Sequence, residues 1–173
     1  MPELANDLAL SKKIQSVKAS GIRIFDNKVS TIPGIIKLTL GEPDMNTPEH
    51  VKTAAIESIR NNDSHYAPQK GKLELRQAIS NYLKKATGVV YDPETEIVVT
   101  VGATEAINAT LFSITNPGDK VAIPTPVFSL YWPVATLADA DYVLMNTSED
   151  NFKLTPERLE STLKEESNIK AVI

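Results

Sequence analysis

The chain has 173 residues, of which 42% are hydrophobic and 23% are charged, and its formal net charge is −4. These values are ordinary for a soluble globular protein, and the mild acidity argues against nucleic acid as a partner, which usually binds a basic face. The sequence has no cysteine, which excludes disulfides, thiolate metal sites and a cysteine nucleophile. It shows neither a signal peptide nor the roughly 20 consecutive apolar residues of a membrane span. We therefore expect a cytoplasmic protein without a membrane partner.

The first part of the chain predicts short elements separated by polar segments. Its mixed, polar start contains a short helix at 8–17, and an apolar run at 35–40 predicts a strand that ends at Gly41. A helix then begins near Pro48, because Thr47 is a good N-cap residue and proline is favoured at the first helical position. The mixed, polar start up to about residue 30 is typical of an arm or of the first piece of a second domain.

A second helix is predicted at 72–85. It has an apolar stripe with helical spacing, and Gly88 follows as a residue that commonly ends helices. The two helices are separated by the polar loop 61–71, which contains Tyr66.

From residue 97 onwards, β-branched apolar runs alternate with helical segments. Such repetition predicts an α/β fold in which a largely parallel sheet is covered by helices on both faces, with right-handed crossovers. The expected order is strand 97–101, helix 104–114, strand 120–123, a helix from near 126, strand 141–145, a helix capped by Thr155, and strand 169–173.

The junction between strand 97–101 and the next helix has the pattern of a phosphate-binding turn. Gly102 lets the backbone turn closely, and the N–H groups of Ala103 and Thr104 open a helix whose start favours anions. Glu105 disfavours phosphate if its carboxylate turns inward. An ordinary strand-to-helix turn also fits this local pattern, and neither a P-loop nor a dinucleotide-binding motif is present.

A second candidate segment, residues 124–133, follows the strand 120–123 and carries Phe128, Tyr131 and Trp132. Its start lies at the carboxyl edge of the sheet, where open α/β sheets bind ligands. Aromatic rings at this edge can stack on a flat ligand, whereas packing into the core is the alternative for each of them.

Other local signals are weaker. Gly41 after a strand lets a ligand approach the backbone, although a plain turn is the simpler explanation. Tyr66 by itself is typical of a loop residue. His50 and His65 lack the spacing of metal ligands, so no metal site is predicted, and no Ser/His/Asp set suggests nucleophilic catalysis.

Taken together, four segments in this order resemble the fold-type I aminotransferases, which use pyridoxal 5′-phosphate. The resemblance spans nearly the whole chain and is strongest to the subgroup that includes bacterial aromatic and aspartate aminotransferases. It implies the amino-terminal portion of a three-layer fold with a largely parallel sheet. The segments are Leu-Thr-Leu-Gly-Glu-Pro-Asp (38–44), His-Tyr-Ala-Pro (65–68) followed by Gly71 and Leu75-Arg76, Val-Thr-Val-Gly-Ala-Thr-Glu-Ala (99–106), and Pro-Thr-Pro-Val-Phe-Ser-Leu-Tyr (124–131).

The resemblance also implies roles for particular residues. The backbone of Gly41 would contact the substrate carboxylate, and residues 102–104 would hold the cofactor phosphate. Phe128 matches the position whose ring stacks on the cofactor pyridine, where the family more often has tryptophan or tyrosine. Tyr66 matches a tyrosine that reaches the phosphate of the neighbouring subunit, which implies a homodimer or another self-association.

Several groups that the family needs have no counterpart in these 173 residues. They are the lysine that bonds to the cofactor, the aspartate at the pyridine nitrogen, the asparagine and tyrosine at the ring oxygen, and the arginine that binds the substrate carboxylate. Lys37 and Lys170 have apolar neighbours, but neither matches the context of the family's lysine. We therefore assign no catalytic residue.

These expectations combine into one interpretation. Residues 1–45 would form an amino-terminal arm and a piece of the small domain, and residues 46–173 would form the first part of the large cofactor-binding domain, cut within a strand. The whole enzyme would transfer an amino group between an amino acid and a 2-oxo acid, and this part alone would be inactive. A pyridoxal-phosphate-dependent carbon–sulfur lyase and a non-catalytic module that binds a phosphorylated ligand or a protein remain alternatives.

Overall fold

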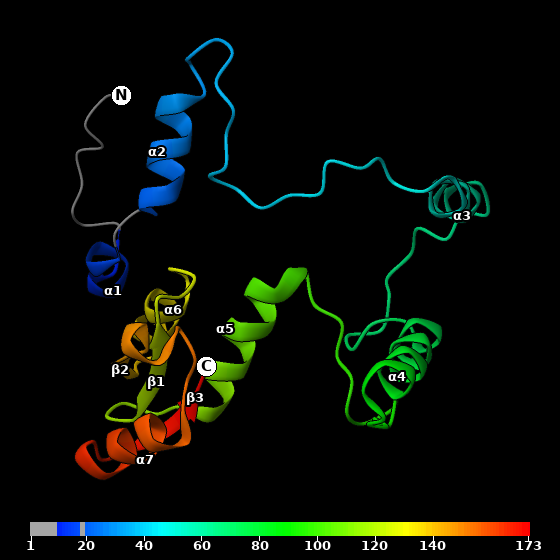
Figure 1. Ribbon diagram of the computed structural model, residues 1–173. Helices are drawn as coiled ribbons and strands as arrows, with labels where there is room; N and C mark the ends of the chain where they lie inside the picture. Colours follow the sequence, from blue (N-terminus) through cyan, green and yellow to red (C-terminus); the bar gives the residue numbers. More distant parts are fainter. Residues whose placement is uncertain (1–9, 18–19) are drawn as a thin grey trace. The chain divides into compact units, whose positions relative to one another are not determined.

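The computed structural model describes residues 10–17 and 20–173, and the chain divides into two units that we describe separately (Figure 1). Unit 1 joins the chain up to Lys37 with Gly102–Ile173, and unit 2 is Leu38–Val101. Within the described ranges, none of the helices has the length and apolar character needed to cross a lipid bilayer.

Unit 1 contains a parallel sheet of three strands in the order β2-β1-β3. The central strand β1 (Lys120–Thr125) pairs along its whole length with β2 (Asp141–Asn146), and Lys120 lies opposite Asp141. On its other side β1 pairs with β3 (Ile169–Val172), with a register shift between Lys120 and Val121. The predicted strands at 120–123, 141–145 and 169–173 are thus confirmed, as are the α/β class and the parallel sheet.

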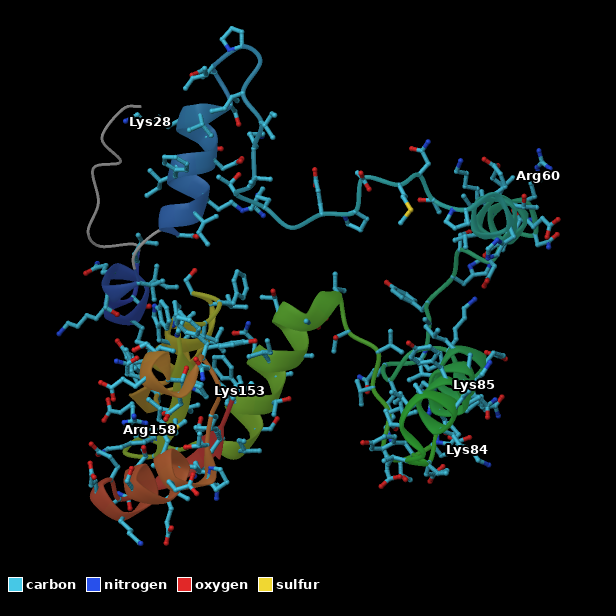
Figure 2. The ribbon with its side chains drawn as sticks, viewed as in Figure 1. Lys28, Arg60, Lys84, Lys85, Lys153 and Arg158 are labelled. Atoms are coloured by element: carbon cyan, nitrogen blue, oxygen red, sulfur yellow. The ribbon has the colours of Figure 1, made fainter. Side chains whose placement is uncertain are left out.

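Helices connect these strands, as the alternating pattern predicts. Helix α5 (Gly102–Ile114) precedes β1, and α7 (Pro156–Glu165) lies between β2 and β3, after the short 3-10 helix η1 (Ser148–Asp150). The hydroxyl of Thr155 accepts a hydrogen bond from Arg158 N at 3.2 Å, which confirms the predicted cap. Figure 2 shows the side chain of Arg158 on α7, and its Nε lies 3.2 Å from a carboxylate oxygen of Asp150.

Helix α6 (Tyr131–Leu137) begins later than the expected position near 126. The reason is the location of Pro133. Proline has no N–H and is tolerated in the first turn of a helix, whereas a helix starting near 126 would place Pro133 in its interior. Residues 126–130 therefore form a loop at the carboxyl end of β1.

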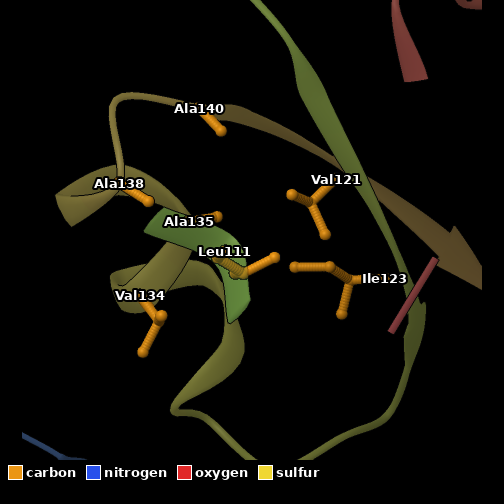
Figure 3. Packing of buried hydrophobic residues seen from close by; sticks show 7 residues of the cluster. All are labelled: Leu111, Val121, Ile123, Val134, Ala135, Ala138 and Ala140. Atoms are coloured by element: carbon orange, nitrogen blue, oxygen red, sulfur yellow. The ribbon is translucent and has the colours of Figure 1, made fainter. Parts of the chain in front are cut away.

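The core of unit 1 lies between β1 and the helices α5 and α6 (Figure 3). Val121 and Ile123 are completely buried in this cluster. Because successive strand residues point to opposite faces, the equally buried Ala122 shows that both faces of β1 are covered. The Thr115 hydroxyl donates to Leu111 O at 2.8 Å and Ala138 O at 3.1 Å, which joins the ends of α5 and α6. The buried cluster comprises Leu111, Val121, Ile123, Val134, Ala135, Ala138 and Ala140.

The amino-terminal part of unit 1 differs from expectation. The helix expected at 8–17 is the shorter α1 (Lys12–Ser16), and residues 8 and 9 lie outside the described ranges. The structure adds α2 (Gly21–Val29), which the sequence analysis did not predict. The Asp26 side chain of α2 is largely buried, and its carboxylate lies 3.5 Å from Lys37 Nζ.

Unit 2 contains the two predicted helices, α3 (Glu49–Arg60) and α4 (Leu73–Thr87). Pro48 immediately precedes α3, one residue earlier than the expected helical position. Gly88 ends α4 with a φ of 78°, a left-handed conformation that favours glycine. Lys84 and Lys85 lie in the last turn of α4 (Figure 2), where cations complement the helix dipole.

Two expected strands, 35–40 and 97–101, are not strands in the structure. A strand needs a neighbouring strand to pair with its backbone, and none lies beside either segment among the residues that the structure describes. Within the segment 97–101, the backbone N–H of Val99 donates to Lys70 O at 2.9 Å. Val101 has 90% of its surface exposed.

Candidate functional site

The expected phosphate-binding turn is the first turn of α5. Gly102 opens this helix with a φ of 81°, a conformation that L-residues rarely adopt. A side chain at Gly102 would meet no heavy atom within 4 Å, so space next to this backbone is open. Ala103 and Thr104 are exposed. Asn108 Nδ2 donates to Thr104 O at 2.8 Å, so this contact uses the carbonyl of Thr104 and not its N–H group.

The aromatic segment after β1 separates into packed and exposed residues. Tyr131 and Trp132 pack against the core cluster, so the core alternative is correct for both. Phe128 has 58% of its surface exposed, and its ring meets the Tyr131 ring edge-on at a centroid distance of 6.3 Å and an interplanar angle of 89°. Tyr131 therefore supports the Phe128 ring from one edge and leaves much of the ring accessible.

Unit 1 brings the first turn of α5 and Phe128 to the same end of its sheet. Helix α5 and β1 are joined by a tight turn, in which Asp119 N binds Asn116 O at 3.0 Å, so the helix runs against the strand. The 13 residues of α5 and the 6 residues of β1 are both about 20 Å long. The start of α5 is thus level with the carboxyl end of β1, where Phe128 follows (Figure 1). This is the edge at which open α/β sheets bind ligands.

The other two predicted site residues, Gly41 and Tyr66, belong to unit 2. Gly41 lies in an exposed segment without regular structure, where a side chain would meet nothing within 4 Å. Tyr66 is fully exposed on the loop between α3 and α4.

The loop that carries Tyr66 is fixed near its start by a polar cluster that the sequence analysis did not identify. Asp63 N binds Ser58 O at 3.0 Å, and the Ser58 hydroxyl donates to the Asp63 carboxylate at 3.1 Å. Lys72 Nζ forms an ion pair with the same carboxylate. Hydrogen bonds from Lys72 and Ser58 lower the pKa of Asp63 below its usual value of 3.8.

The end of the same loop is held by Arg76, whose side chain is buried. Arg76 Nε donates to Gly71 O at 3.1 Å, and a terminal guanidinium nitrogen binds Pro93 O. The carboxylate of Glu94 lies 3.8 Å from the guanidinium. One buried cation thus joins the end of the loop to the turn at residues 92–96. In that turn, hydrogen bonds from the Thr95 hydroxyl and the Glu94 N–H lower the pKa of Asp92.

We predict that removing the Lys72 ammonium changes the acid titration of Asp63. In Lys72→Met the pKa of Asp63 should rise toward 3.8 because the largest cause of its depression is gone. A carboxyl group whose pKa is lower in the folded state stabilises the fold at pH values above the pKa of the unfolded state. This contribution disappears as the pH falls through the pKa of the folded state. The difference between the two proteins should therefore be present at neutral pH and vanish in stronger acid.

The carboxyl 13C chemical shift of Asp63 measures this titration directly. Lys52→Met is the matched control, because Lys52 forms an exposed ion pair with Glu49 at 2.7 Å on α3. The control should leave the Asp63 midpoint unchanged. An Asp63 midpoint that is the same in Lys72→Met and in the unaltered chain would contradict the prediction.

Neither lysine considered in the sequence analysis lies in buried apolar surroundings. Lys37 Nζ contacts the Ser30 hydroxyl at 3.1 Å and the Asp26 carboxylate, and Lys170 occupies an exposed position of β3.

Comparison with known proteins places these features in one family. The model of the family "Aminotransferase class I and II" matches residues 33–173. The chain is 42% identical over 164 residues to a probable N-acetyl-LL-diaminopimelate aminotransferase of Bacillus subtilis, covering 95% of this chain and 41% of that protein. It is 40% identical over 154 residues to aromatic-amino-acid aminotransferase 2 of Thermococcus litoralis, covering 88% of this chain and 40% of that protein.

Solved structures give the same result. An aspartate aminotransferase from Thermus thermophilus with maleate has a TM-score of 0.87 at 32% identity, covering 94% of this chain and 43% of that one. An aromatic aminotransferase from Pyrococcus horikoshii has a TM-score of 0.81 at 36% identity, covering 95% and 40%. The chain thus spans about two fifths of the length of the relatives it matches. It belongs to the class I and II aminotransferase family.

Proposed function

We propose that this chain supplies the cofactor-phosphate site of an aminotransferase that transfers an amino group between an amino acid and a 2-oxo acid. The proposed cofactor is pyridoxal 5′-phosphate. The observation that carries the proposal is the start of α5, where Gly102 has a left-handed backbone beside open space and Phe128 lies at the same edge of the sheet. The family membership supports it.

The residues present fit a phosphate ester attached to a flat ring. The N–H groups of Ala103 and Thr104 and the Thr104 hydroxyl are donors at a helix start, where the dipole favours an anion by about 0.3–1 kcal/mol at an exposed position. Each hydrogen bond to a charged phosphate oxygen adds about 1.5–3 kcal/mol. Any side chain at position 102 would both strain the backbone and occupy the open space that the phosphate needs.

The remaining site residues are assigned in the same proposal. The exposed face of Phe128 would cover one side of the cofactor ring, and the backbone of Gly41 would bind the substrate carboxylate. Tyr66 would bind the phosphate of a second subunit in a homodimer, in agreement with its full exposure. When bound, the cofactor supplies an aldehyde and an electron-accepting ring for chemistry at the substrate amine. Residues of this chain bind and orient it, and we propose none of them as the acid–base group.

Turnover in a hybrid protein tests the function. The 173-residue chain alone should show no transamination with pyridoxal 5′-phosphate. Joined to the part of the Bacillus subtilis relative that follows the matched segment, it should convert an amino acid and a 2-oxo acid into the exchanged pair. Thr104→Val in the hybrid should lower kcat/KM about tenfold, the loss of one hydrogen bond to a charged group.

Thr110→Val is the matched control, because Thr110 is exposed on the same helix but distant from its first turn. It should leave kcat/KM of the hybrid unchanged. A well-folded hybrid that consumes the amino acid by elimination, without amino transfer, would point to the lyase alternative. Transamination by the 173-residue chain alone would contradict the proposal that its acid–base group lies elsewhere.

A further inference from the structure

The position of Tyr66 depends on the backbone of its loop. The loop runs from the end of α3 at Arg60 to the start of α4 at Leu73, and Tyr66 lies near its middle with its side chain fully exposed. Packing against its own unit therefore does not hold the ring. An exposed hydroxyl that binds a phosphate keeps its position only if the backbone that carries it is fixed. Small displacements would weaken its hydrogen bond, because hydrogen bonds are directional.

One polar contact fixes the start of the loop, and a second joins its two ends. The backbone bond from Asp63 N to Ser58 O attaches the loop to the last turn of α3. The ion pair between Lys72 and Asp63 then joins the first and last parts of the loop across Tyr66. Within the loop, Gly71 N binds Pro68 O at 2.8 Å and forms a tight turn.

The end of the loop is fixed by backbone and side-chain hydrogen bonds, of which those of Arg76 are part-buried. Lys70 O accepts the Val99 N–H at 2.9 Å, and Lys70 Nζ donates to Glu94 O at 3.1 Å. Arg76 holds the carbonyl of Gly71 and that of Pro93 with a side chain that is 7% exposed. Burying a guanidinium is costly unless its donors are satisfied, and here two separate backbone carbonyls accept from it and are thereby held in place.

The same contacts reach the segment that leads into the phosphate-binding turn. Val99 lies three residues before Gly102, and its N–H is bonded to the loop that carries Tyr66. One hydrogen-bonded assembly within unit 2 thus includes the backbone of the Tyr66 loop and of Val99.

We propose that Lys72, Asp63 and Arg76 are positioning residues that hold Tyr66 for binding a cofactor phosphate. The proposal rests on the function proposed above and adds residues that act through Tyr66 without touching the cofactor. A positioning residue loses its effect on phosphate binding once the Tyr66 hydroxyl is absent. A residue that only stabilises the fold keeps its effect in that case.

A double-mutant cycle on the whole chain tests this. Pyridoxal 5′-phosphate and pyridoxal, which lacks the phosphate, are titrated by NMR into the unaltered chain, Tyr66→Phe, Lys72→Met and the double variant. Tyr66→Phe should weaken pyridoxal 5′-phosphate binding about tenfold. Lys72→Met should weaken it severalfold and speed amide exchange at residues 64–70. The double variant should bind no more weakly than Tyr66→Phe, and pyridoxal affinity should stay unchanged throughout.

One further variant controls for stability, and another tests Arg76. Lys52→Met removes the ion pair with Glu49 in the same unit and should change neither the phosphate-dependent affinity nor the exchange of the loop. Arg76→Lys keeps the positive charge but lacks the forked geometry needed to hold both carbonyls, so it should behave as Lys72→Met does.

The outcomes separate this inference from the proposed function. Additive losses in the double variant would overturn the inference and leave Tyr66 as a ligand. An unchanged affinity in Tyr66→Phe, together with a loss in Thr104→Val, would overturn the inference and leave the phosphate-binding turn of α5. If the unaltered chain binds pyridoxal 5′-phosphate no better than pyridoxal, the proposed function and the inference are both wrong.

Discussion

Ile123→Ala should lower the free energy of unfolding of unit 1 by about 3–4 kcal/mol. Ile123 is completely buried in the central strand of the sheet, in one cluster with Leu111 of α5 and Val134 of α6 (Figure 3). Truncation to alanine removes apolar contacts to two helices at once. The backbone of β1 is paired on both sides, so the surroundings are held in place and the cavity cannot readily collapse.

Urea unfolding followed by circular dichroism measures the loss, and Ile36→Ala is the matched control. Ile36 also belongs to unit 1 but has 86% of its surface exposed, so the same truncation should change the free energy of unfolding by less than about 0.5 kcal/mol. Equal losses in the two variants would show that the cluster around Ile123 does not form the core of unit 1.

The parts of the fold that the sequence predicted are those with local signals. The strands β1, β2 and β3 are apolar runs bounded by turn residues, α7 has Thr155 as its cap, and α4 has Gly88 at its end. Each of these features is determined by residues close together in the chain. The alternation of such elements was enough to predict a parallel α/β sheet.

The failures have two causes, which are contacts absent from the local pattern and local signals that are weak or were not used. Residues 97–101 have strong β propensity, but pairing requires an adjacent strand, and in unit 2 the segment bonds instead to Lys70 of the Tyr66 loop. The late start of α6 could have been predicted from Pro133, because proline marks the first turn of a helix. Helix α2 was missed because its segment lacks a clear cap, and Ser20 makes no side-chain cap bond.

The candidate site shows the same division. Gly102 and Phe128 were identified from short motifs, and the structure brings them to the same edge of the sheet. The cluster around the Tyr66 loop was missed because its partners are far apart in the chain. Lys72 binds a carboxylate nine residues away, and Arg76 binds the carbonyl of Pro93, 17 residues away. For the pair of Lys72 and Asp63, the one available signal was the presence of opposite charges at the two ends of a polar loop.

Gly71→Ala should disrupt the packing between the Tyr66 loop and the segment 97–101. Gly71 has a φ of 90°, and a Cβ at this position would lie 2.7 Å from both Cβ and Cγ2 of Val99. The left-handed backbone costs about 1–2 kcal/mol for an L-residue. The overlap adds about 1–3 kcal/mol, because Val99 is stiff at χ1 and rotation about χ1 cannot move its Cβ away from the new methyl group. The bond from Val99 N to Lys70 O should weaken most, since it lies next to the overlap.

Amide hydrogen exchange at Val99 reports this contact directly, and Gly88→Ala provides the matched control. Gly88 also belongs to unit 2 and has a φ of 78°, but a Cβ there would meet nothing within 4 Å. Protection of the Val99 amide should fall about 30-fold or more in Gly71→Ala, corresponding to about 2 kcal/mol, and less than about threefold in Gly88→Ala. Gly88→Ala has backbone strain of the same kind but makes no contact with Val99, so it controls for strain in unit 2 that does not act through Val99. If both substitutions reduce the protection equally, the close packing of Gly71 on Val99 does not hold the loop, and the Tyr66 backbone depends on the polar contacts of Asp63, Lys72 and Arg76 alone.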